Sequence, residues 1–218
     1  MSPATPLGGY EVLFLMAAEA EYGPDLRRRF TPVITGVGPV EGAISTTVTL
    51  AEMRAAGRLP DLVVSLGSAG SARLEQGGVY QAASVAYRDM DASPLGFARG
   101  ETPFLDLPAT LALPHRIAGL AQASLSTGGD IVSGAAYAGI AEDMVDMESF
   151  AILRACQRFD LPLVVLRGIS DGAAPLEGLH SWTEYLYIVD ARLAEAVDLL
   201  AAELLSGRIK LERRDAAP

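Results

Sequence analysis

The chain has 218 residues, half of them apolar and 20% charged, with 17 Lys and Arg against 27 Asp and Glu and a net charge of −10. That length suits one domain with a sizeable core, and the apolar content excludes a disordered chain. The acidic balance disfavours nucleic acids and anionic membranes as partners, because the basic cluster "LRRRF" at 26–30 is short.

Cysteine and histidine content limits the possible covalent and metal sites. Cys156 is the only cysteine, which excludes an internal disulfide and favours a reducing, cytoplasmic location. The two histidines, His115 and His180, cannot form a multi-histidine site by themselves, so we expect no metal and no cofactor. The N-terminus lacks the pattern of a secretion signal, and no apolar run reaches the roughly 18 residues of a membrane span.

Short apolar runs alternate with helical patterns along the chain. Strands are predicted at 12–16, 31–38, 61–70, 79–91 and 161–168. A helix that ends at Gly57 is predicted from apolar residues at helical spacing, namely Val40, Ala43, Ile44, Thr47, Val48 and Ala51. The segment 143–159 is predicted as a strand end followed by a helix, and 182–204 as a long amphipathic helix.

This alternation predicts an α/β fold. We expect three layers, with a mixed, mostly parallel central sheet flanked by helices. No repeat or long linker divides the chain, which predicts a single domain over 1–218 with loose ends at 1–10 and 207–218. The least regular region, 90–123, is rich in Gly and Pro and still aromatic, so it is predicted to be a structured loop at a site or a subunit interface.

Polar side chains recur where predicted strands end. Glu21 follows the first strand, the loop "GSAG" at 67–70 ends the third, and Arg167, Ser170 and Asp171 follow the apolar run of the last. Each feature alone fits an ordinary turn or helix start, but the carboxyl edge of an α/β sheet is where ligands bind. Arg167 needs a carboxylate partner after a buried run, and Glu148 and Glu21 are the candidates.

The glycines of "TGVGPVEG" at 35–42 do not predict a dinucleotide site. The third glycine is displaced from the dinucleotide fingerprint, and Pro39 stands where a phosphate-facing N–H is wanted. We therefore expect no nicotinamide cofactor.

Six segments carry a family resemblance: "MAAEAEY" at 16–22, "TGVGPV" at 35–40, "VVSLGSAGS" at 63–71, "YRDMD…LGF" at 87–97, "VDMES" at 145–149 and "LPLVVLRGISDGA" at 161–173. In this order they resemble a methylthioadenosine/S-adenosylhomocysteine nucleosidase, within the nucleoside phosphorylase superfamily. The resemblance covers residue 12 to about 190. It implies that water cleaves the N-glycosidic bond of methylthioadenosine or S-adenosylhomocysteine and releases adenine.

The resemblance also implies roles for single residues. Asp171 matches the acid that protonates adenine N7, with Ser170 bonded to it, and burial would keep this carboxyl protonated. Glu21 matches the carboxylate that activates water, which Arg167 and Ser68 help to hold. The expected substrate-binding residues are Glu148 at the ribose hydroxyls with Asp146 beside it, Met147 under the sugar, and Val37, Ser68, Ala69, Gly70, Val132, Ser133 and Trp182 around the purine.

A further match predicts a homodimer with shared sites. Phe97 and Pro103 lie in a loop, 92–105, that in the family reaches across the dimer to the partner's 5′-substituent pocket. The chain departs from the family in four places. It lacks an extra hairpin between Phe30 and Thr31, has Asp146 where Glu is more usual and Pro39 where Lys is more usual, and needs a one-residue insertion to align Trp182.

Three alternatives remain open. A futalosine or aminodeoxyfutalosine nucleosidase would differ in the 5′ pocket. A purine nucleoside phosphorylase needs cations for phosphate, and this chain has Ser65 where one normally stands. A non-catalytic nucleoside-binding module, from a different class, predicts loss of Asp171 or Glu21, and both are present.

Overall fold

The computed structural model describes residues 3–172 and 174–211. Within these residues, nine strands form one mixed sheet. The strands are β1 (Thr5–Leu7), β2 (Tyr10–Met16), β3 (Val33–Ile34), β4 (Leu62–Gly70), β5 (Val79–Tyr87), β6 (Thr110–Ala112), β7 (Gln122–Thr127), β8 (Met144–Asp146) and β9 (Leu163–Asp171). The α-helices are α1 (Pro24–Arg27), α2 (Pro39–Ala55), α3 (Ser149–Arg158), α4 (Leu179–Thr183) and α5 (Leu186–Leu205), and the 3₁₀ helices are η1 (Glu19–Glu21), η2 (Ser93–Leu95) and η3 (Gly134–Gly139).

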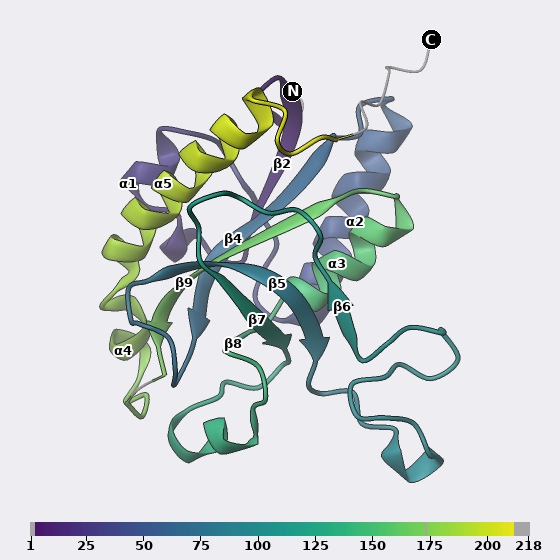
Figure 1. Ribbon diagram of the computed structural model, residues 1–218, viewed down its shortest axis with the longest axis vertical. Helices are drawn as coiled ribbons and strands as arrows, with labels where there is room; N and C mark the ends of the chain where they lie inside the picture. The colour runs from purple at the N-terminus through teal and green to yellow at the C-terminus, as the bar shows by residue number, and fades with distance from the viewer. Residues whose placement is uncertain (1–2, 173, 212–218) are drawn as a thin grey trace.

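The sheet closes on itself around its longest strands. β9 pairs in parallel with β4 and antiparallel with β5, while β7 pairs with β5 and β8. A single pair, Gly70 with Val145, joins β8 back to β4 and completes a ring of five strands. Helices α2 and α3 lie on one side of the sheet and α1 and α5 on the other (Figure 1). The predicted three-layer α/β fold with a mixed, mostly parallel sheet is therefore confirmed.

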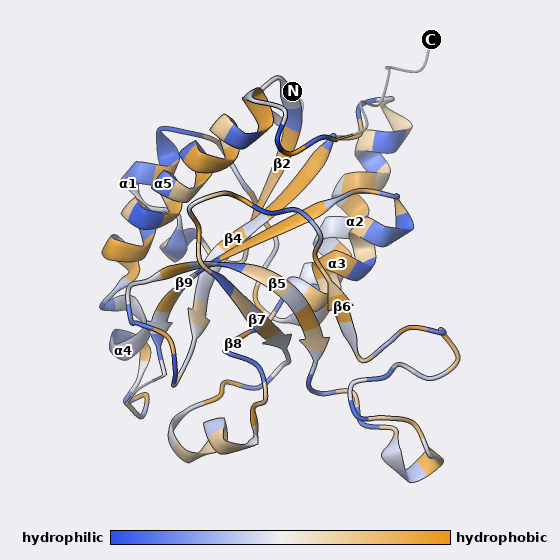
Figure 2. Ribbon diagram, viewed as in Figure 1, coloured by the Kyte–Doolittle hydropathy of each residue, from blue (hydrophilic) through white to orange (hydrophobic). Residues whose placement is uncertain are grey.

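The central strands bury both of their faces, which explains their continuous apolar runs. In β2, Leu13 and Leu15 pack towards α2 and α3, while Val12, Phe14 and Met16 pack towards α5. In Figure 2 the middle of the sheet, at β2 and β4, is mostly orange, the colour of apolar residues. None of the helices in the described residues has the length and apolar character needed to cross a membrane.

Glycines allow close packing where β9 approaches the site. A Cβ on Gly168 would lie 2.4 Å from Cγ1 of Val189, so α5 can pack on the strand only because this residue has no side chain. Gly172 follows with φ +123°, and a Cβ there would lie 2.4 Å from the backbone oxygen of Ser71. These two positions hold the end of β9 between α5 and β4.

Helix α2 is confirmed, but the row of apolar residues that predicted it faces solvent. Val40, Ile44 and Val48 are 65%, 53% and 51% exposed. The buried side of the helix consists of Gly42, Thr46, Leu50 and Met53. The sequence pattern therefore marks an apolar outer surface in addition to the core-facing side.

The chain ends differ from their predicted loose state. β1 pairs antiparallel with β2 and finishes that edge of the sheet. Ile209 is buried against the α5 side of the core. Residues 1–2 and 212–218 lie outside the described residues.

Three further elements differ from the sequence prediction. The region 90–123 contains β6 and the start of β7, which we predicted as loop. β9 continues through Asp171 instead of ending at Gly168. The long C-terminal helix is interrupted near Tyr185 and forms α4 and α5. The extension of β9 fixes Asp171 on a strand, where its backbone position is held by pairing with Gly70.

Candidate active site

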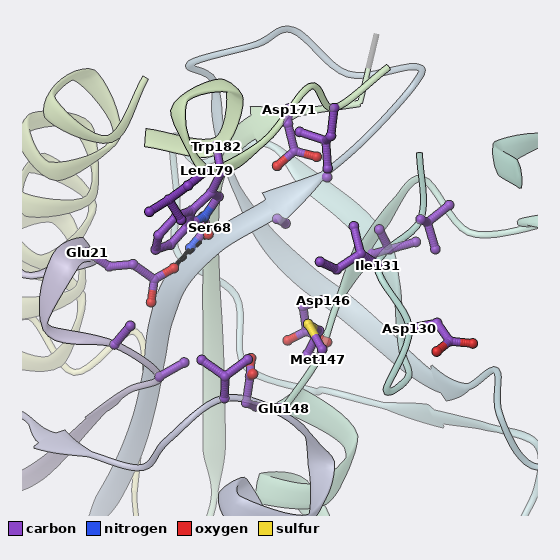
Figure 3. A pocket seen from close by; sticks show the side chains of 18 of the residues that line it. Glu21, Ser68, Asp130, Ile131, Asp146, Met147, Glu148, Asp171, Leu179 and Trp182 are labelled. Carbon is purple, nitrogen blue, oxygen red and sulfur yellow. Dashed lines mark hydrogen bonds between the residues drawn. The ribbon is translucent and has the colours of Figure 1, made fainter. Parts of the chain in front are cut away.

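A cavity of about 540 Å³ lies at the carboxyl ends of β4 and β9 (Figure 3). The expected site residues that line it are Glu21, Val37, Ser68, Ala69, Gly70, Val132, Asp146, Met147, Glu148, Asp171 and Trp182. They come from η1, the β3–α2 turn, β4, the β7–η3 loop, the β8–α3 junction, β9 and α4. The topology thus brings together residues that lie up to about 160 positions apart in the sequence, as a site at the edge of a sheet requires.

Glu21 lies on the turn after β2 and is buried, 6% exposed. Its Oε1 accepts hydrogen bonds from the backbone N–H of Ser68 at 2.7 Å and from the Ser68 hydroxyl at 2.6 Å. Trp182 Nε1 donates in turn to Ser68 Oγ at 2.8 Å, which continues the chain seen in Figure 3. Oε2 of Glu21 has no hydrogen-bond partner among the described residues. Burial raises the pKa of Glu21, and the bonds from Ser68 only partly oppose that rise.

Asp171 ends β9 on another side of the cavity. The Ser170 hydroxyl donates to Asp171 Oδ2 at 2.7 Å, and Ser170 itself is fully buried behind the cavity wall. Burial raises the pKa of Asp171, and the bond from Ser170 opposes this in part. The partial burial of Asp171 therefore favours the protonated form of its carboxyl group.

Glu148 lies between β8 and α3 and is 7% exposed. Its Oε1 accepts a 2.8 Å bond from the backbone N–H of Gly38. Gly38 has φ +99°, a conformation that favours glycine, and this aims its N–H at the carboxylate. Burial, reinforced by the nearby charge of Asp146, raises the pKa of Glu148 to about 7.

Arg167 lies differently from the expectation that it helps to hold water. Its guanidinium sits behind the cavity and bonds to Asp146 Oδ2 from Nε at 3.1 Å and from Nη2 at 2.8 Å. Nη2 also donates to Ser65 and Ser149, and Nη1 donates to the Leu166 carbonyl. Its ion-pair partner is therefore Asp146, and neither Glu148 nor Glu21 takes that place.

Asp146 lines the cavity, but its carboxylate is bonded to protein groups. Oδ1 accepts from the Thr127 hydroxyl at 2.6 Å, and Oδ2 accepts from Ser149 as well as Arg167. The side chains of Arg167 and Asp146 are 3% and 1% exposed, so they form a buried ion pair. Removing either partner would leave the other charge buried and uncompensated. Asp146 thus holds Arg167 and influences Glu148 through its charge.

Three other expected residues do not line the cavity of this chain. Ser133 Oγ accepts a 2.9 Å bond from the backbone N–H of Leu176, so this side chain holds the loop after β9 and does not contact the cavity. Phe97 and Pro103 lie in the loop between β5 and β6, and Phe97 contacts Phe104 edge to face. Their expected role concerns a partner subunit, so it stays a prediction.

Sequence reasoning missed several residues that line the cavity: Ala17, Ala18, Arg88, Asp130, Ile131, Val145, Leu176, Gly178 and Leu179. Arg88 belongs to the quoted "YRDMD" segment and follows β5, so its position at a strand end was an available signal. Its two terminal nitrogens donate to four backbone carbonyls, two of them in the loop after β7. Arg88 therefore fixes the loop that forms one wall of the site.

The described residues contain no group of three or more His, Cys, Asp and Glu side chains suited to a metal ion. Cys156 is buried in α3, away from the cavity-lining residues. The chemistry that the site offers is that of carboxyl groups placed around an otherwise largely apolar cavity: Glu21 and Glu148 are buried, and Asp171 is partly buried.

The chain is similar to known proteins of one family. A family model described as "Phosphorylase superfamily" matches residues 26–205. A curated 5′-methylthioadenosine/S-adenosylhomocysteine nucleosidase from Actinobacillus succinogenes is 34% identical over 190 residues, which cover 78% of this chain and 79% of that relative.

Solved structures share the fold. The 5′-methylthioadenosine/S-adenosylhomocysteine nucleosidase of Neisseria meningitidis, in complex with methylthio-immucillin-A, matches with a TM-score of 0.73 and 24% identity, covering 88% of this chain and 98% of that one. Futalosine hydrolase of Helicobacter pylori matches with a TM-score of 0.70 and 18% identity, covering 91% of this chain and 97% of that one.

Proposed function

Because this chain belongs to the phosphorylase superfamily and, within it, to the 5′-methylthioadenosine/S-adenosylhomocysteine nucleosidases, we propose that it hydrolyses the N-glycosidic bond of those two nucleosides. The products are adenine and the 5′-thioribose. The protein is thus an N-glycosyl hydrolase. The observation that best supports water as the nucleophile is the buried, cavity-lining Glu21, whose Oε2 has no hydrogen-bond partner among the described residues.

Asp171 is the proton donor in this proposal. As the bond from C1′ to N9 lengthens, its electron pair moves into the purine, and N7 takes the proton from Asp171. The raised pKa of Asp171 supports this role, since burial favours the protonated form. Ala69 and Gly70 on β4 and Trp182 on α4 offer small and flat surfaces for the base.

Glu21 is the base that activates water. Its Oε1 is held by Ser68, which leaves Oε2 to accept a proton from water as that water attacks C1′. Figure 3 shows Glu21 and Asp171 on separate sides of the cavity, as acid and base must be when water attacks opposite the leaving group. Burial raises the pKa of Glu21, and Arg167 acts on this side through its charge, which opposes that rise in part.

Glu148 and Met147 bind the sugar. Glu148 has one oxygen bonded to Gly38, which leaves the other to accept from ribose hydroxyls. Met147 supplies an apolar contact beside it. The negative charge of Glu148 also stabilises the oxocarbenium-like sugar of the transition state.

Phosphorolysis fits this cavity poorly. Arg88 is the one cation among the described residues that line it, and its terminal N–H groups are already bonded to backbone carbonyls. Phosphate would also be repelled by the Glu21 carboxylate. Aminodeoxyfutalosine differs from methylthioadenosine at its 5′ substituent, so that alternative is decided by assay.

One assay tests the proposed reaction. The pure protein is incubated with methylthioadenosine, S-adenosylhomocysteine, inosine and aminodeoxyfutalosine, each with and without phosphate, and free base and sugar product are measured. We expect adenine and methylthioribose at the same rate in both conditions. Strict dependence on phosphate would contradict hydrolysis, and cleavage of aminodeoxyfutalosine alone would assign the second nucleosidase activity instead.

We further propose a homodimer in which the loop 92–105, with Phe97 and Pro103, completes the partner's site. The apolar outer face of α2 supports it, because Val40 and Ile44 line a surface groove of about 490 Å³ between α2 and α3. The loop also presents apolar side chains, with Phe104 91% exposed. The cytoplasmic location stays a prediction from the single cysteine.

Ile44→Asp tests the dimer, because a charge in an apolar interface disfavours association. We expect sedimentation equilibrium to give a dimer for the wild type and a monomer, with weaker substrate binding, for Ile44→Asp. Leu205→Asp, at an exposed site on α5, is the control and should stay dimeric. A fully active wild-type monomer would contradict the shared site.

A further inference from the structure

Tyr137 has a buried hydroxyl group close to Asp171, the proposed proton donor. The residue lies in η3, the short helix within the loop between β7 and β8 (Figure 1). Its hydroxyl oxygen is inaccessible to solvent and makes no hydrogen bond with the described residues. Buried hydroxyl groups nearly always have a partner, so this one requires an explanation.

Gly70 defines where this hydroxyl lies. A Cβ on Gly70 would be 2.2 Å from the Tyr137 hydroxyl oxygen and 2.9 Å from Asp171 Oδ1. The two oxygens therefore border one small space, and their separation cannot exceed the sum of those distances. The absence of a side chain at Gly70 leaves this space open. A hydrogen bond between them requires the two oxygens to approach each other within this space.

The two oxygens of Asp171 have different surroundings. Oδ2 already accepts from Ser170, whereas Oδ1 faces the space shared with Tyr137. The charged group that acts on Tyr137 besides Asp171 is Arg88, from the end of β5. Glu21 and Glu148 lie on other sides of the cavity. Burial, reinforced by Asp171, raises the pKa of Tyr137, so its hydroxyl keeps a proton to donate.

We propose that Tyr137 is a positioning residue for the proton transfer, donating a hydrogen bond to Asp171 Oδ1 as the carboxylate forms. The inference rests on the proposed hydrolysis. When Asp171 gives its proton to N7, its carboxyl group becomes negatively charged in a largely apolar cavity. Ser170 stabilises one oxygen and Tyr137 stabilises the other, so Asp171 becomes a stronger acid and keeps its orientation.

Tyr137→Phe removes the hydroxyl and keeps the ring. We expect kcat on methylthioadenosine to fall roughly 10- to 100-fold, with little change in KM, because a hydrogen bond to a charged group is lost in the transition state. The loss of a donor to the carboxylate raises the pKa of Asp171, so the basic limb of the kcat/KM profile moves to higher pH. Tyr80→Phe, in β5 and not among the cavity-lining residues, is the matched control and should leave both unchanged.

A second measurement separates this inference from the proposed function. In protein labelled with ¹³C at the aspartate carboxyls, the pKa of Asp171 should be higher in Tyr137→Phe than in wild type, whether or not the nucleoside is cleaved. An unchanged Asp171 pKa and an unmoved basic limb would overturn the role of Tyr137, even if activity falls. Absence of hydrolysis by the wild type would instead contradict the proposed function.

Discussion

Asp171→Asn should lower turnover on adenine nucleosides by at least about 100-fold, because a positioned proton donor contributes ~10²–10⁴ in rate. Asparagine keeps the size of the side chain and can still bond to Ser170, but it has no acidic proton for N7. Without that proton, adenine has to leave as an anion into an apolar cavity, where charge is poorly solvated. Substrate binding should change much less than turnover.

Adenine release at saturating methylthioadenosine measures this effect. Asp198→Asn is the control, since Asp198, on α5, does not line the cavity and forms a partly exposed ion pair with Arg29, which contributes little to stability. Both variants should show cooperative unfolding like that of the wild type. Near-normal turnover in Asp171→Asn would remove Asp171 from its assigned role.

The position of Asp171 could be predicted from sequence because the local apolar pattern and the topology of the sheet both place it at the carboxyl edge of the sheet. The run from Leu163 to Leu166 is apolar at every position, as expected for a strand covered on both faces. The polar residues after it must then emerge at the carboxyl edge, where the neighbouring strand β4 ends in Gly70. Glu21 follows β2 in the same way.

The partner of Arg167 could not be predicted in that way. Asp146 and Glu148 stand two positions apart at the end of β8, and either carboxylate is compatible with the sequence. Side-chain length and the direction of each residue decide between them: Asp146 points behind the cavity to Arg167, and Glu148 reaches Gly38. Tertiary packing fixes these directions, and no local pattern records them.

Two other features escaped sequence reasoning for different physical reasons. Apolar residues at helical spacing were sufficient to predict α2, but spacing does not say whether an apolar side faces the core or another chain, and Ile44 lies outside. Tyr137 lies in a segment of glycines and alanines without periodicity, "SGAAYAGI" at 133–140. Its position beside Asp171 depends on how the β7–β8 loop folds back over Gly70.

Glu21→Gln should lower kcat by about 100-fold or more, because glutamine cannot take a proton from the attacking water. It should also change the pH profile. Glu21 must be ionised to act, and burial raises its pKa above the ordinary carboxyl value, so wild-type kcat falls as pH drops through that raised pKa. The variant should lose this acidic limb. Glu19→Gln, on the same turn but exposed, is the control and should retain it.

The pH dependence of kcat distinguishes the titration of Glu21 from that of Glu148. Glu148 has a pKa of about 7 without substrate, so its protonation should affect binding as pH falls. Ribose hydroxyls that donate to Glu148 favour its ionised form in the complex, which lowers its pKa there. An acidic limb that persists in kcat of Glu21→Gln would therefore assign the water-activating base to another group.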